Sequence, residues 1–183
     1  MKHEFAPDRL DMRAFAQSSS QLAGSEPMAR YSRILQECRG HGSELLVSWA
    51  ARGEIRGAQP EMGQVWLHLH ADLLAPLTCQ RCLEVVDVPL LVDRSFRLVA
   101  DEETAAALDD DSEEDLLVLA GDFNLHVLIE DELVLALPMI ARHEVCPGQP
   151  ALMASDAEFG VAVAGRPNPF TALARLKSNR GPK

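Results

Sequence analysis

Two cysteines near the middle of the chain, Cys79 and Cys82, are separated by two residues, a spacing that suits metal ligands. Polar and apolar residues alternate before them over residues 64–73, and a run rich in valine and leucine follows over residues 85–91. Both runs have the pattern of β-strands. A turn between two strands can present two thiolates to a metal ion. It is a poor redox site, because a thioredoxin-like thiol needs a helix N-terminus behind it to lower its pKa.

A second pair of candidate ligands, His143 and Cys146, has the same two-residue gap. The two pairs together would supply three thiolates and one imidazole, a set that suits tetrahedral zinc. We therefore predict one zinc site formed by Cys79, Cys82, His143 and Cys146. The alternative is that these are ordinary thiols with a surface histidine nearby, because short motifs also arise by chance. A zinc-dependent hydrolase is excluded, since four protein ligands leave no open position for water.

The length and composition are those of one globular domain, which we expect to span residues 1–183. The chain has 183 residues, of which 47 % are hydrophobic and 25 % are charged. Its N-terminus lacks the apolar segment of a signal peptide. Its apolar run Leu133–Ala141 is interrupted by a proline and is far shorter than the roughly 18 residues that span a bilayer. We therefore expect a cytoplasmic protein with reduced thiols and no membrane partner.

The net charge of −11 is distributed very unevenly along the chain. Residues 101–165 contain 16 acidic side chains and one basic one, whereas residues 166–183 contain five basic side chains and no acidic one. We predict an acidic mobile loop over residues 101–115 and a basic flexible tail over residues 177–183. Four cations at this end are candidate nucleic-acid-binding residues: Arg175, Lys177, Arg180 and Lys183. The alternative is a basic helix end whose cations complement the helix dipole.

The hydrophobic periodicity predicts an α+β fold in which an antiparallel β meander, which could curl toward a barrel, packs with N-terminal, central and C-terminal helices. The expected elements are helices over residues 8–17 and 25–40, strands over 45–51, 64–78, 83–98 and 115–120, and helices over 124–137 and from residue 168. On the second helix, Cys38 falls on the apolar stripe and is expected in the core. His68 and His70 share one face of the middle strand and could bind a metal or simply face solvent.

Three stretches in a fixed order carry a resemblance to a known family. They are Cys79-Gln80-Arg81-Cys82-Leu83, the acidic helix from Ile129 to Pro138, and the segment from Pro167 to Lys177. In this order they resemble the bacterial YceD family, the large ribosomal RNA subunit accumulation proteins. Several relatives carry further cysteines after the acidic helix, where this chain has only His143 and Cys146.

The resemblance implies a ribosome biogenesis factor that supports the accumulation or processing of large-subunit (23S) rRNA, with no enzymatic activity and no small-molecule substrate. Its partners would be the pre-ribosomal large subunit, through rRNA or a ribosomal protein. The sequence agrees, since it has no motif that assembles a nucleophile, a base and an oxyanion site. Because the chain is acidic overall, contact with RNA would be local. A cytoplasmic thiol oxidoreductase that uses Cys79 and Cys82 is the alternative.

Overall fold

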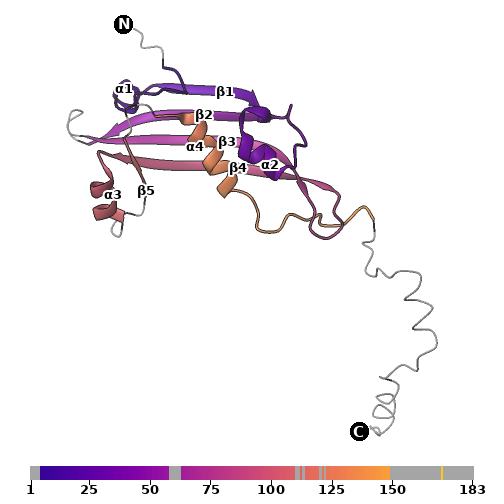
Figure 1. Ribbon diagram of the computed structural model, residues 1–183. Coiled ribbons are helices and arrows are strands. Elements are labelled where there is room, and N and C mark those ends of the chain that lie inside the picture. Colours follow the sequence, from indigo (N-terminus) through magenta and orange to yellow (C-terminus); the bar gives the residue numbers. More distant parts are fainter. Residues whose placement is uncertain are drawn as a thin grey trace. The chain divides into compact units, whose positions relative to one another are not determined.

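The computed structural model describes residues 5–57, 63–109, 112, 114–119, 121, 123–148 and 170 (Figure 1). The chain forms two compact units, residues 1–146 and 147–183. The elements belong to the first unit and are α1 Met12–Gln17, β1 Gln21–Pro27, the 3-10 helix η1 Met28–Arg30, α2 Ser32–Glu37, β2 Leu46–Arg56, β3 Gln64–Thr78, β4 Val85–Val99, α3 Glu102–Asp109, β5 Asp115–Val118 and α4 Leu125–Leu135. The prediction of one domain over residues 1–183 stays a prediction.

The five strands form one sheet in the order β1-β2-β3-β4-β5. The first four strands are antiparallel neighbours, and β5 lies parallel to β4. Strands β3 and β4 form the longest pairing of the sheet, a hairpin that runs from Val65 opposite Leu98 to Thr78 opposite Val85. The α+β class and the meander were therefore predicted correctly, but the sheet is open and does not close into a barrel.

The core lies between one face of the sheet and helices α1, α2 and α4, of which α4 crosses β3 and β4 (Figure 1). Alternate residues of β3, such as Leu67 and Leu69, point into this core, and the apolar face of α4 covers them. Burying one such side chain contributes about 1.5–3 kcal/mol. None of the helices in the described part of the chain is long and apolar enough to cross a bilayer.

The predicted start of the chain was partly wrong. Residues 21–27, expected as a loop and the beginning of a helix, form the edge strand β1. Apart from Leu22 and Pro27, their side chains are small or polar and carry no apolar alternation, so the strand is held mainly by its backbone pairing with β2. The helix expected from Ser25 is instead η1 followed by α2, which are separated at Tyr31. Cys38 is buried in the core, as predicted.

The acidic stretch expected as a loop over residues 101–115 contains helix α3, so the loop prediction was wrong for residues 102–109. The carboxylate of Asp101 accepts a 2.8 Å hydrogen bond from the backbone amide of Thr104, which caps the first turn. Glu102 and Glu103 lie in that turn, where negative charge complements the helix dipole. Three consecutive alanines follow, and alanine has the highest intrinsic helix propensity.

Candidate metal centre

The turn between β3 and β4 brings Cys79 and Cys82 together. The backbone amide of Cys79 donates to the carbonyl of Glu84 at 2.8 Å, and the amide of Leu83 donates back to the carbonyl of Cys79 at 2.9 Å. Leu83 closes the turn in the left-handed region, with φ 65°, a conformation that a leucine adopts only when its surroundings impose it. The two thiols therefore lie on one side of a tight turn at the tip of the hairpin.

The segment that follows α4 supplies the other two ligands. Ala141 is buried, and its carbonyl accepts a 2.8 Å hydrogen bond from the amide of Gln80 in the turn. The guanidinium of Arg81 donates to the carbonyl of His143 at 2.5 Å and to that of Glu144 at 3.3 Å. We call residues 136–146 the arm. These contacts lay the arm against the hairpin tip, where its His143 and Cys146 meet the two cysteines.

The four predicted ligands converge on one point. Their Sγ and ring-nitrogen atoms all lie within 4.8 Å of one another. The Sγ atoms of Cys79 and Cys146 are 3.9 Å apart, and Cys82 Sγ is 3.4 Å from His143 Nδ1. In a tetrahedron with Zn–S bonds of about 2.3 Å and a Zn–N bond of about 2.0 Å, the corresponding edges are about 3.8 Å and 3.5 Å. Both of these separations thus match the edges of a four-coordinate zinc site.

A backbone carbonyl fixes the orientation of the His143 ring. His143 Nε2 lies 3.0 Å from the carbonyl oxygen of Val85, which can only accept a hydrogen bond, so Nε2 carries the proton. Nδ1 then keeps its lone pair, and this atom faces the sulfurs. Metal-binding histidines in proteins are oriented by such a second hydrogen bond. No sequence pattern indicated Val85 as this acceptor, or Arg81 as the residue that holds the arm.

The surroundings of the thiols favour one thiolate strongly. Burial by itself raises the pKa of Cys79, but hydrogen bonds from the backbone amides of Cys82, His143 and Arg81 outweigh it and lower that pKa to about 5. The amide of Glu84 favours the Cys82 thiolate, yet desolvation and the neighbouring sulfurs raise the pKa of Cys82 overall. Several thiols this close cannot all ionise without a compensating positive charge. A divalent cation would supply that charge.

The other predicted residues lie elsewhere. Cys38 is in the core, with Sγ 4.0 Å from the sulfur of Met28, and burial raises the pKa of its thiol. His68 and His70 lie on the face of the sheet opposite the core, and the Cys/His group is the one such convergence found in the described residues. The predicted nucleic-acid-binding residues lie outside the described residues: Arg175, Lys177, Arg180 and Lys183.

Comparison with known proteins shows to which family the chain belongs. Residues 67–177 match the family model described as large ribosomal RNA subunit accumulation protein YceD. The chain belongs to the YceD family. A curated protein from Haemophilus influenzae with the name Large ribosomal RNA subunit accumulation protein YceD is 36 % identical over 106 residues. That alignment covers 55 % of this chain and 59 % of the relative, so it spans less than two thirds of the relative's length.

No solved structure matches the chain. The stretch matched to the YceD family model contains all four candidate ligands, both strands of the long hairpin and helix α4. It leaves out α1, β1, α2 and β2. The part of the chain that resembles other YceD proteins is therefore the part that forms the candidate metal centre.

Proposed function

We propose that this YceD protein is a non-enzymatic factor that supports the accumulation of large-subunit (23S) rRNA in the cytoplasm. The observation that carries the proposal is the match of residues 67–177 to a family named for this role, together with the similarly named curated relative. Its partners would be the pre-ribosomal large subunit, through rRNA or a ribosomal protein.

We further propose that Cys79, Cys82, His143 and Cys146 bind one zinc ion with a structural role. The separations of Cys79 from Cys146 and of Cys82 from His143 match tetrahedral edges, and the histidine is oriented by a second hydrogen bond. All four positions would be taken by protein ligands, so the ion would activate no water molecule. Its effect would be to join the arm to the hairpin tip, two segments 61 residues apart at Cys82 and His143.

We also propose that the basic C-terminal residues make a local contact with rRNA phosphate. Arg175, Lys177, Arg180 and Lys183 follow the most acidic part of the chain, so they would concentrate positive charge at one end. Each phosphate contact that is lost should lower the salt slope of RNA binding by roughly one unit. Reversing all four charges should therefore weaken association with pre-ribosomal particles, and unchanged association at low salt would remove this part of the proposal.

The thiol oxidoreductase alternative has little physical support. Cys79 is fully buried, whereas a thiol that attacks a disulfide must be accessible. Backbone amides of the turn do lower the pKa of Cys79, but its half-buried neighbour Cys82 has a raised pKa, which disfavours the thiolate that would have to attack. A neutral-pH assay with a disulfide substrate separates the two functions. Turnover that disappears in Cys82→Ser would favour the oxidoreductase.

Depletion of the protein followed by rRNA profiling tests the proposed function. We expect large-subunit rRNA precursors to accumulate and mature large subunits to fall in a sucrose gradient, while small subunits persist. The matched control is re-expression of the protein from a second copy, which should restore the profile. Unchanged precursors and unchanged large subunits after depletion would overturn the proposal.

A further inference from the structure

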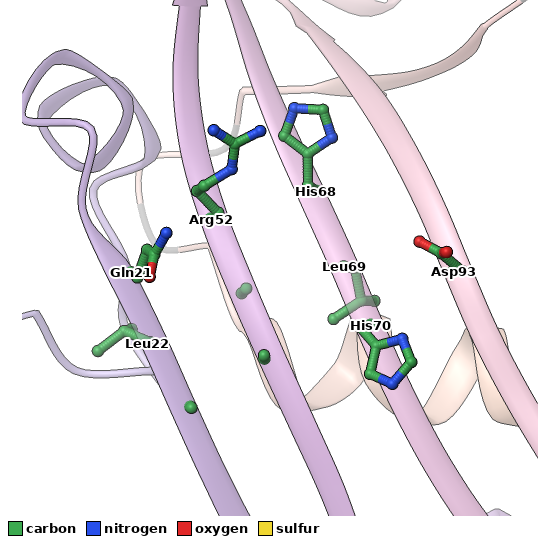
Figure 2. Close-up of a pocket in the computed structure, with 10 residues that line it drawn as sticks. Gln21, Leu22, Arg52, His68, Leu69, His70 and Asp93 are labelled. Atoms are coloured by element: carbon green, nitrogen blue, oxygen red, sulfur yellow. The ribbon is translucent and has the colours of Figure 1, made fainter.

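The face of the sheet opposite the helices, here called the open face, carries a hollow of about 320 Å³ across β1, β2 and β3 (Figure 2). Ala23 and Ala50 are register partners in its lining, and the small side chains leave the space empty. Figure 2 shows the longer side chains of Arg52 and His68 on one side of it and His70 on the other. The hollow is therefore lined on β2 and β3 by small or apolar residues together with Arg52, His68 and His70, and Asp93 of β4 lines it as well.

Positive charge exceeds negative charge beside this hollow. One carboxylate, that of Glu54, serves three partners: Arg52 at 3.2 Å, Arg56 at 3.0 Å and His68 at 2.9 Å. The two guanidinium groups stay about half exposed, at 49 % and 44 %. Arg97 lies on the same face, opposite Trp66, and has no ion pair among the described residues. Three arginines therefore lie on this part of the open face against two carboxylates, those of Glu54 and of Asp93, the second of which lines the hollow itself.

We propose that this basic half of the open face, formed by Arg52, Arg56, Arg97 and His68, binds the phosphate backbone of RNA. The inference rests on the proposed role in rRNA accumulation and adds a contact surface within the described fold. A local excess of arginine is what phosphate binding requires in a chain whose overall charge of −11 repels RNA. Arginine also matches phosphate geometry better than a point charge does.

The surface is suited to the backbone of RNA and not to its bases. Sequence-tolerant stacking on bases needs exposed aromatic rings. The aromatic residue of this patch, Trp66, is 4 % exposed, and the guanidinium of Arg56 covers its ring at 4.0 Å from the centroid. The groups that remain accessible are guanidinium donors, because both ring nitrogens of His68 already have partners in Ser95 and Glu54. Contact with RNA would therefore be insensitive to sequence.

The acidic residues on the open face set the direction in which RNA would cross it. Asp93 lies opposite His70, and Asp72 follows two residues further along β3. Both carboxylates repel phosphate. An RNA strand would therefore run from Arg52 toward Arg97 and away from Asp72 and Asp93. From the strand spacing of about 4.8 Å and the rise of about 3.3 Å per residue, the Cα atoms of Arg52 and Arg97 are roughly 12 Å apart. One RNA strand can contact both.

The test compares the full-length wild-type protein with Arg52→Gln/Arg97→Gln, using oligouridylate of about 12 nucleotides and an RNA duplex as probes. The control is Arg13→Gln/Arg39→Gln, which changes the net charge equally at two exposed arginines on α1 and after α2. Loss of two phosphate contacts should reduce the slope of log affinity against log salt by about 1.4 on the single strand or 1.8 on the duplex. The C-terminal residues are the same in every protein compared.

The expected result is a reduced slope in Arg52→Gln/Arg97→Gln and a wild-type slope in the control. Arg52→Lys/Arg97→Lys keeps the charge and should retain most of the slope, which separates phosphate binding from damage to the fold. Equal slopes in the two glutamine variants, or no binding of either probe by the wild-type protein at low salt, would overturn the inference. This readout is RNA affinity in vitro, so its failure leaves the depletion test of the proposed function intact.

Discussion

Removing the metal should loosen the arm from the hairpin tip and lower the stability of the whole first unit. A zinc ion bound by both segments would act as a cross-link between Cys82 and His143, which are 61 residues apart. Closing a loop of that length in the unfolded chain reduces its entropy by about 14 cal/mol/K, which is worth about 4 kcal/mol at 25 °C. In a protein of this size, each kcal/mol of stability that is lost lowers Tm by about 2–4 °C. Chelation should therefore lower Tm by roughly 8–17 °C.

The assay is thermal unfolding followed by circular dichroism, with and without a zinc chelator, together with elemental analysis of the purified protein. We expect close to one zinc ion per chain, and full recovery of Tm when zinc is added back. The variant Cys146→Ser should contain less than one zinc per chain and should unfold near the temperature of the chelated wild type. Its Tm should no longer respond to the chelator.

The fourth cysteine supplies the matched control. Cys38 lies in the core next to Met28, away from the cluster, so Cys38→Ala removes a thiol without removing a ligand. This variant should keep one zinc per chain and the full response to chelation, even though the lost thiol leaves a small cavity. A Tm change of less than about 2 °C on chelation, or well under one zinc per wild-type chain, would refute the reasoning.

Three further substitutions test the fold around the site. Asn124→Ala should cost about 1 kcal/mol in urea unfolding, because the Asn124 side chain caps α4 through the amides of His126 and Val127, whereas Asn124→Asp should be nearly neutral. Gly53→Ala should cost about 1–3 kcal/mol, because its added methyl would lie 2.8 Å from a backbone atom of α1; a variant as stable as wild type would show that α1 shifts at little cost. Burial raises the pKa of Glu132, so the native state favours its protonated form and wild-type stability falls as pH rises through that pKa. Glu132→Gln should therefore raise the urea midpoint at pH 7 but not at low pH, and a lower midpoint at pH 7 would contradict this.

The sequence predicted those parts of the fold in which local pattern and tertiary packing agree. Alternating residues along β3 marked its buried face, and the valine-rich run after the turn marked β4. A helix was predicted over residues 124–137, and the Asn124 side chain accepts the hydrogen bonds that cap α4. The matching two-residue gaps suggested the four ligands as one set, but no local pattern showed that His143 and Cys146 would reach a turn 61 residues away.

The elements that were missed depend on partners that no local pattern reveals. Strand β1 exists because β2 offers a free edge, and its own residues lack the alternation of a strand. Helix α3 was missed because its negative charge indicated a loop. Its alanines and its cap at Asp101 stabilise the helix in spite of that charge. Glu132 is buried on α4, which its charge alone would not indicate. The basic open face joins residues from three strands, so it required the register of the sheet.

The ratio of large-subunit to small-subunit rRNA in depleted cells tests the central claim most directly. Cells that re-express the wild-type protein or Cys38→Ala should restore the ratio, while cells that express Cys146→Ser at the same level should not. A ratio that stays normal after depletion would contradict the proposed function. A ratio that Cys146→Ser restores as fully as the wild-type protein would contradict the part that the metal centre is proposed to play in it.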